Sequence, residues 1–170
     1  NCQVAQAAAV NLTSGKLYGL VDMFYAKGAG TAVSAGTITQ TTTANCGNSG
    51  YALKLAGVTL TGTGLVYAYT FIESLNAKQY KNKTASFSVK VYHDVGSAVN
   101  YTIKINKANA ADNFSAVTEI AAASATSVPN TTETLIKFEG VSLGDCSNGI
   151  EIEVSAACGG WNPRRHRQQH

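Results

Sequence analysis

The sequence contains few charged residues and no long apolar run. Charged side chains make up 14% of its 170 residues, whereas an average soluble protein has about 25%. Thr, Ser, Asn and Gly must therefore cover most of the surface, which favours a location outside the cytosol. Because no apolar run approaches the ~20 residues needed to cross a bilayer, we expect no membrane insertion. The first residue is Asn1 rather than Met, which indicates a processed or trimmed product.

Most of the chain also lacks an excess of positive charge. The formal net charge is +3, but the last twelve residues, GGWNPRRHRQQH, contain three arginines and no acidic residue. The remainder is therefore neutral overall, which excludes the basic surface of a nucleic-acid-binding domain. We predict one domain over residues 1–158 and a disordered basic tail over residues 159–170. The composition of the tail fits a natural appendage and a non-native extension equally well.

The common catalytic and phosphate-binding motifs are absent as well, including G-x-S-x-G, H-E-x-x-H and G-x-x-x-x-G-K-[ST]. Cys2, Cys46, Cys146 and Cys158 include no C-x-x-C pair, and His93 is the only histidine outside the tail. A zinc site is therefore not expected, and we expect no cofactor. The even number of cysteines permits Cys146 to bridge Cys158 across the strand GIEIEV, with Cys2 joined to Cys46. Free buried thiols fit the sequence about as well.

An alternation of apolar and polar residues runs through nearly the whole chain. A period of two is typical of half-buried strands, and eight such strands fit two packed sheets. We therefore predict an all-β fold, a two-sheet antiparallel β-sandwich of jelly-roll type. The predicted strands are residues 19–27, 36–43, 51–57, 65–73, 85–94, 100–108, 134–143 and 149–156. A helical turn is expected in residues 74–82, and residues 109–127 are expected to form an irregular crossover with a short strand around Val117 to Ile120.

The outward faces of these strands carry the candidate binding residues. Tyr67 and Tyr69 alternate with Val66, Ala68 and Ile72, so the two tyrosines can face outward while the aliphatic side chains face the core. Flat aromatic rings flanked by a few polar groups are typical of sugar-binding surfaces. Lysines and glutamates of other strands can lie beside the tyrosines, together with Thr102. The predicted ligand-binding residues are Tyr67, Tyr69, Lys90, Tyr92, Lys104, Glu151 and Glu153.

Three alternatives for this face remain open. Tyr67, Tyr69 and Phe71 can instead fill the core while lysines and glutamates form cross-strand pairs. The face can also pack against copies of itself in an oligomer. Finally, Glu151 and Glu153 lie about 7 Å apart along their strand, which is within the range of an inverting glycosidase pair, although an exposed alternating face is the commoner arrangement.

Two further polar positions have structural interpretations. His93 falls on the apolar side of its strand, where a lone histidine is more often a hydrogen-bonded part of the core or sheet edge than a ligand. Asp112 and Asn113 can hold a structural calcium ion with nearby carbonyl groups. A turn or cap is the favoured interpretation of this pair, and we predict no metal site.

Several segments resemble one family in its own order along the chain. These are NCQVAQ (1–6), VDMFYAKGAGTAVSAGTITQ (21–40), SGYALKLAG (49–57), FIESLNAKQYKNKTASFSVKVYHD (71–94) and LIKFEGVSLG (135–144). They resemble the carbohydrate-binding-like β-sandwich modules of phage tail fibre, tail spike and related virion proteins. The resemblance covers about residues 1–158. Phe24 departs from it, because the family often has Trp there, and the closing strand of the family is replaced by the basic tail.

The resemblance implies a function as well as a fold. Similar modules bind surface polysaccharide or support assembly, so we expect a non-catalytic glycan-binding or adhesive module of a phage-type virion structural protein. It implies a location on the virion surface or outside the cell, and assembly as a homo-oligomer such as a trimer. The alternatives are a purely structural module that binds no sugar and a glycan-active enzyme that uses Glu151 and Glu153.

Overall fold

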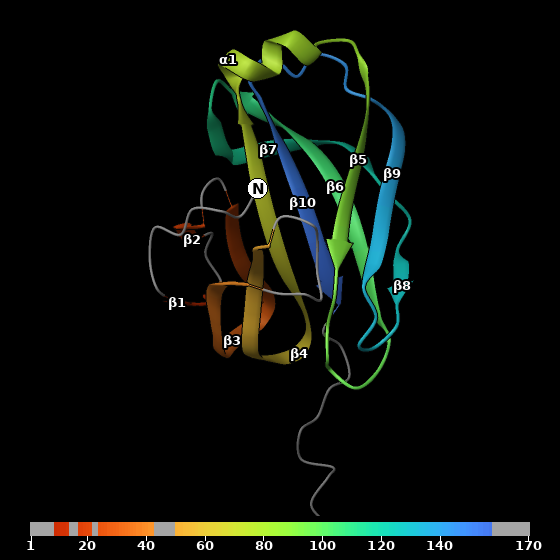
Figure 1. Ribbon diagram of the computed structural model, residues 1–170. Helices are drawn as coiled ribbons and strands as arrows, with labels where there is room; N and C mark the ends of the chain where they lie inside the picture. Colours follow the sequence, from red (N-terminus) through yellow and green to blue (C-terminus); the bar gives the residue numbers. More distant parts are fainter. Residues whose placement is uncertain (1–8, 14–16, 22–23, 43–49, 158–170) are drawn as a thin grey trace, which may run out of the picture.

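The computed structural model describes residues 9–13, 17–21, 24–42 and 50–157. Strands account for nearly all of this part of the chain, and a short helical segment lies at one end of the molecule (Figure 1). The strands are β1 (Val10–Asn11), β2 (Leu17–Val21), β3 (Phe24–Thr41), β4 (Ala52–Glu73), β5 (Thr84–Val91), β6 (Val99–Ala110), β7 (Asn113–Ala122), β8 (Thr126–Val128), β9 (Thr134–Ser142) and β10 (Gly149–Ala157). The helical segment consists of α1 (Ser74–Ala77) and a 3-10 turn, η1 (Lys78–Tyr80).

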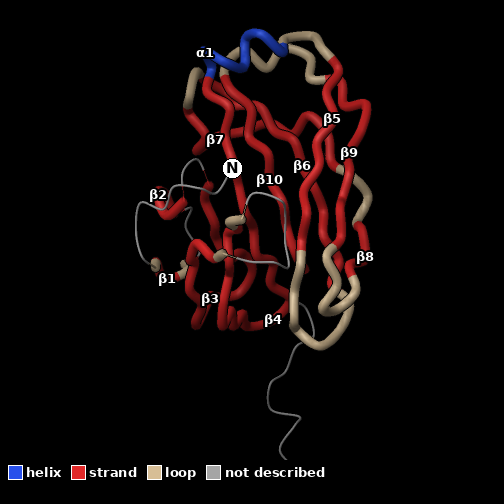
Figure 2. Tube along the Cα trace, in the orientation of Figure 1, coloured by secondary structure: helices blue, strands red, loops and turns tan. Residues whose placement is uncertain are grey.

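The strands form two antiparallel sheets. The large sheet has the order β1-β3-β4-β10-β6-β7, with β2 paired to β3 and β8 paired to β6. The small sheet consists of β5 and β9, which lie beside each other in Figure 2. The predicted fold class, an antiparallel β-sandwich, is therefore confirmed, with ten strands in the described part rather than eight.

The main core lies between the two sheets. Ile103 and Ile105 of β6 and Ile150 of β10 contribute from the large sheet, and Val91 and Ile136 contribute from the small one. Alternation explains this placement, because every second side chain of a strand points to the same face. The intervening residues of β4, β6 and β10 must then point to the opposite face of the large sheet, away from the small sheet. We refer to that opposite face as the outer face.

Neighbouring predicted strands merge in the structure. Most of the predicted strands 19–27 and 36–43 belongs to β3, which continues through the glycine-rich segment between them, whereas residues 19–21 belong to β2, which pairs with β3. The predictions for residues 51–57 and 65–73 likewise fall within β4. The pairing of β3 with β4 shifts its register several times between Ala29 and Thr37. Glycines in a strand often mark such irregularities, so these segments disturb the ladder without ending it.

Strand β7 is the largest departure from the predicted secondary structure. The short strand expected around Val117 to Ile120 is present, but residues 109–127 form less of an irregular crossover than expected, because this strand has ten residues, Asn113–Ala122, and pairs with β6. Its alternation is weak because alanines and short polar residues occupy most of its positions. The ring of Phe114 nevertheless stacks on Phe71 of β4, with the centroids 4.2 Å apart. Since β10 lies between β6 and β4, the start of β7 must cross over the outer face.

The helical turn predicted after β4 is confirmed by α1 and η1. Asp112, at the turn between β6 and β7, anchors it by accepting hydrogen bonds from the backbone N–H of Ser74 and from Ser74 Oγ, the latter at 2.8 Å. These bonds lower the pKa of the Asp112 carboxyl. The favoured interpretation of Asp112 as a cap is thus confirmed. The described residues contain no cluster of three or more His, Cys, Asp or Glu side chains placed to hold a metal ion, and no helix among them is long and apolar enough to span a membrane.

The cysteine expectations need one correction. Cys146 is a free, buried thiol, and its Sγ lies 3.6 Å from the carbonyl oxygen of Ala77. A bridge from Cys146 to Cys158 is therefore wrong, and the alternative of a free buried thiol is confirmed for Cys146. Cys2, Cys46 and Cys158 lie outside the described residues, as does the predicted tail.

His93 is part of the core, as its position on the apolar side of its strand indicated. The side chain is buried, and its Nε2 lies 3.0 Å from the carbonyl oxygen of Val128. The imidazole also stacks on the ring of Tyr101, with the centroids 6.0 Å apart. These contacts join the end of β5 to β6 and β8, which is a structural role.

Candidate functional site

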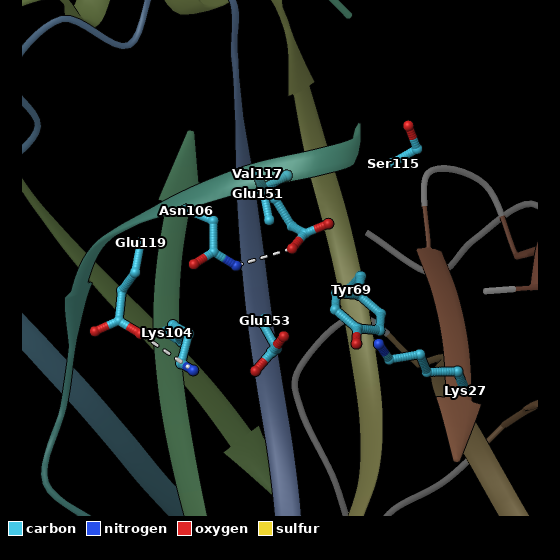
Figure 3. Close-up of a pocket in the computed structure, with 9 residues that line it drawn as sticks. All are labelled: Lys27, Tyr69, Lys104, Asn106, Ser115, Val117, Glu119, Glu151 and Glu153. Carbon is cyan, nitrogen blue, oxygen red and sulfur yellow. Dashed lines mark hydrogen bonds and ion pairs between the residues drawn. The ribbon is translucent and has the colours of Figure 1, made fainter. Parts of the chain in front are cut away.

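A polar pocket of about 350 Å³ lies on the outer face of the large sheet. Side chains from five strands, β3, β4, β6, β7 and β10, converge on it (Figure 3). The lining residues are Lys27, Tyr69, Lys104, Asn106, Ser115, Val117, Glu119, Glu151 and Glu153.

Strand register explains why the central residues meet. Glu153 of β10 lies opposite Tyr69 of β4 on one side and opposite Lys104 of β6 on the other. Glu151, two residues earlier, lies opposite Phe71 and Asn106. Residues that are opposite one another in a ladder point to the same face. The pocket floor therefore consists of two adjacent rows of side chains, one through Glu153 and one through Glu151.

Strand β7 forms the wall of the pocket. It contributes Ser115, Val117 and Glu119, and its ribbon runs across the strands of the floor in Figure 3. Stacking of Phe114 on Phe71 holds the start of this strand over the sheet. Gly149 makes the crossing possible, because a Cβ atom at this position would lie 2.7 Å from Cζ of Phe114.

The two floor carboxylates are almost fully buried. The side chain of Glu151 is 1% exposed and that of Glu153 is 9% exposed. Asn106 Nδ2 donates a hydrogen bond of 2.8 Å to Glu151 Oε1, and burial of a charge is tolerated only with such partners. At the edge of the pocket, Lys104 Nζ lies 3.2 Å from Glu119 Oε2. The hydrogen bond to Glu119, and the nearby charge of Glu153, raise the pKa of the Lys104 ammonium.

Two tyrosine rings and a lysine form the side of the pocket opposite Lys104 and Glu119. The rings of Tyr67 and Tyr69 are stacked, with centroids 5.8 Å apart, and Lys27 Nζ lies 5.0 Å and 5.3 Å from the two centroids. Burial raises the pKa of the Tyr69 phenol, and the charges of Glu153 and Glu151 raise it further. Burial and Glu153 raise the pKa of Tyr67 in the same direction.

The structure brings together most of the predicted site residues. Five of them occupy neighbouring register positions on the outer face, as the alternation along their strands predicted. These are Tyr67, Tyr69, Lys104, Glu151 and Glu153. Their ability to bind a ligand stays a prediction. The alternative that Tyr67, Tyr69 and Phe71 fill the core holds only in part, because Tyr69 and Phe71 are buried whereas Tyr67 is half-buried. They are covered on the outer face, where β7 crosses, and not in the core between the sheets.

The inclusion of Lys90 and Tyr92 in the same surface was wrong. Lys90 belongs to β5, which pairs only with β9 among the described residues and lies in the small sheet. Its Nζ is 2.8 Å from Glu133 Oε1. Tyr92 follows directly after this strand. Alternation predicts the face of a strand on which a side chain lies, but it does not predict the sheet to which the strand belongs, which explains the error.

Sequence reasoning missed several lining residues. Asn106 has the parity of Lys104 in the strand YTIKINKA and could have been found by that signal. Lys27 ends a predicted strand, but only its pairing opposite Tyr67 places it in the site. Ser115, Val117 and Glu119 were missed because their segment was expected to be irregular.

Comparisons with known proteins support the fold. No protein-family model matches the chain, and no curated protein sequence matches it. A solved structure from work on the promiscuous specificity of carbohydrate-binding modules of the β-sandwich superfamily is similar, with a TM-score of 0.55 and 14% sequence identity. The similarity covers 79% of this chain and 50% of that chain, so this chain matches about half the length of that structure. At this identity the similarity shows a shared β-sandwich fold, and none of these comparisons connects the chain with phage tail fibres or tail spikes.

Proposed function

We propose that this chain is a non-catalytic carbohydrate-binding module whose binding site is the pocket on the outer face. The observation that carries the proposal is the convergence of buried polar side chains from several strands on one hollow, in a fold that carbohydrate-binding modules share. Small-ligand pockets begin at about 300 Å³, so a volume of about 350 Å³ suits a short glycan unit and not a long segment of chain.

The lining chemistry supports a sugar as ligand. Sugar hydroxyl groups are donors and acceptors, and the carboxylates of Glu151 and Glu153 accept hydrogen bonds while Lys27 donates them. Hydrogen bonds to charged groups are roughly twice as strong as neutral ones. Val117 supplies an apolar surface on the wall, where the C–H groups of a sugar ring can pack. Because Tyr69 is 1% exposed, recognition depends on the polar groups and not on an open aromatic platform.

The biological setting is part of the proposal. The resemblance of residues 1–158 to modules of phage tail fibres and tail spikes supports an adhesive role in a virion structural protein, at the virion surface or outside the cell. We propose a homo-oligomer such as a trimer, because repeated shallow sites gain avidity when several engage one polysaccharide. Electron microscopy and mass photometry of the purified chain test this assembly, and a strictly monomeric protein would overturn it.

A glycan-active enzyme is the second candidate. It is favoured by the placement of Glu151 and Glu153 in one pocket, since two carboxylates are the usual machinery of glycoside hydrolysis. Incubation with a polysaccharide panel tests it. Product release that disappears in Glu153→Gln would establish the enzyme, and the absence of products from the wild-type chain would support the binding module.

The binding proposal is tested with a glycan array followed by titration calorimetry. We expect wild-type protein to bind at least one glycan class, and Glu153→Gln to weaken that binding at least about tenfold, since a charge-assisted hydrogen bond is lost. Glu139→Gln is the matched control, because Glu139 lies on β9 in the small sheet and is exposed. Absence of binding to any glycan, or equal losses in the two variants, would contradict the proposed site.

A further inference from the structure

The pocket is acidic, although the chain as a whole is not. Three carboxylates line it, Glu119, Glu151 and Glu153, against two ammonium groups, Lys27 and Lys104. Lys104 is engaged by Glu119 at 3.2 Å. Lys27 lies over the rings of Tyr67 and Tyr69, where the electron-rich ring faces attract its charge. The net formal charge of the lining residues is therefore negative.

The negative charge is concentrated in the row that contains Glu151. The ladder pairs place Phe71, Glu151, Asn106 and Glu119 in succession across β4, β10, β6 and β7. This row has two carboxylates and a neutral amide, and its cation, Lys104 beside Glu119, comes from the neighbouring row. The neighbouring row contains Glu153 opposite Lys104. In Figure 3, Glu151 lies beneath Val117, while the ammonium groups of Lys27 and Lys104 lie on either side of Glu153.

We propose that this pocket selects sugars with a free amino group over neutral, N-acetylated and acidic sugars. This inference rests on the proposed function and names its ligand class. The amino group of such a sugar is protonated near neutral pH and binds in the row through Glu151. Ser115 and Val117 of β7 close that row from above.

Donor and acceptor chemistry gives the reason for the preference. An ammonium group donates three hydrogen bonds and accepts none, whereas an ionised carboxylate only accepts and has about four acceptor positions. A carboxylate that accepts a bond from a neutral amide, as Glu151 Oε1 does from Asn106, can also accept one from a cationic donor. An N-acetyl group lacks the charge and adds bulk beneath β7. An acidic sugar would place a third anion beside two buried carboxylates, which is unfavourable.

The tyrosines of the pocket lie in the same negative potential. Burial raises the pKa of both phenols, and the charge of Glu153, joined by Glu151 at Tyr69, raises it further, so a second anion is disfavoured at both positions. The same potential that disfavours a phenolate favours an ammonium ion. Its direction agrees with the balance of carboxylates and lysines obtained from geometry.

The test compares three ligands that differ at a single substituent. The full chain is titrated calorimetrically with a β-linked glucosamine oligomer, with its fully N-acetylated form and with the matching glucose oligomer. We expect the glucosamine oligomer to bind at least about tenfold more tightly than the other two.

Variants place the preference at the Glu151 row. Glu151→Gln should reduce the preference for the amino sugar to within about threefold, since it removes a charge-assisted bond. Because Glu151 is buried, Glu119→Gln provides a second variant at an exposed position of the same row, and it should reduce the preference several-fold. Glu139→Gln should leave it unchanged.

The outcomes separate this inference from the proposed function. Equal or tighter binding of the neutral or N-acetylated oligomer overturns the amino-sugar preference and leaves carbohydrate binding intact. A preference that persists in both Glu151→Gln and Glu119→Gln also overturns it, because the attraction would then come from elsewhere. Failure of the wild-type chain to bind any of these sugars or any glycan of the array overturns both proposals.

Discussion

Tyr69 and Glu153 lie directly opposite each other on β4 and β10, and both side chains are buried on the outer face of the large sheet. A phenolate at this position would be buried and would face the charges of Glu153 and Glu151. The fold therefore stabilises the neutral phenol, which is why its pKa is raised.

This pair predicts alkaline destabilisation. A group whose folded-state pKa is raised contributes its full stability below its unfolded pKa, which is about 10 for tyrosine. That contribution is lost as the pH rises above this value. We expect the free energy of unfolding to fall above pH ~10 by up to about 1.4 kcal/mol per pH unit from Tyr69. Urea unfolding between pH ~8 and ~11 measures the slope.

Two variants assign the slope to this residue. Tyr69→Phe removes the titrating group, so its curve should be flatter above pH ~10 than that of the wild type. Tyr80→Phe is the control, because Tyr80 is exposed on η1, and its curve should remain parallel to that of the wild type. Parallel curves for Tyr69→Phe and the wild type would show that Tyr69 is not held neutral by its surroundings.

Asn106 is predicted to be important for stability because it supports a buried charge. Its bond of 2.8 Å to Glu151 is lost in Asn106→Leu, which has a similar volume. A hydrogen bond to a charged group contributes about 1.5–3 kcal/mol, so we expect a loss of this size in the free energy of unfolding, measured in urea. Asn100→Ala is the control at an exposed position of the same strand and should cost less than about 0.5 kcal/mol. A loss as small as that of the control would mean that Glu151 does not depend on Asn106.

The sequence contained much of the fold because its dominant signal is local. Period-two alternation in β6 and β10 correctly separates Ile103, Ile105 and Ile150, which face the core, from Lys104 and Asn106, which face outward. Alternation also places Tyr69 of β4 and Glu153 of β10 on the same face, where they lie opposite each other. Such patterns need no knowledge of which strands are neighbours.

The missing parts depend on pairing between distant segments. Only the ladder shows that β5 joins β9 in a separate sheet, which removes Lys90 from the site. The wall of the pocket depends on the stacking of Phe114 with Phe71, two residues that are far apart in sequence. Their contact fixes the path of a strand whose own alternation is weak, so no local pattern could predict that Ser115 and Glu119 line a pocket.

Cys146 is predicted to be protected in the native state. Burial raises the pKa of its thiol, and the thiolate is the reactive form. We expect a thiol reagent at neutral pH to modify Cys146 at least about tenfold more slowly in native protein than in urea, as followed by peptide mass mapping. The same maps under non-reducing conditions should contain no peptide pair linking Cys146 to Cys158. Rapid modification of the native thiol, or such a linked pair, would contradict the packing of Cys146 against Ala77.

Gly149 is predicted to control both stability and the pocket wall. Its φ is +124°, and an added Cβ would lie 2.7 Å from Cζ of Phe114 and 3.3 Å from the carbonyl oxygen of Ile72. Gly149→Ala therefore combines backbone strain with a clash that moves β7. We expect a loss of about 2–6 kcal/mol in the free energy of unfolding, since strain and overpacking each cost about 1–3 kcal/mol.

A second glycine separates the clash from the strain. Gly140 has a positive φ of +71°, but an added Cβ would meet nothing within 4 Å, so Gly140→Ala should cost only about 1–2 kcal/mol. Combining Gly149→Ala with Phe114→Ala should give a double-mutant cycle with a coupling of at least about 0.5 kcal/mol, because the clash needs both side chains. Additive losses in urea unfolding would show that β7 does not depend on the space that Gly149 leaves for Phe114, and the pocket would then need another explanation for its wall.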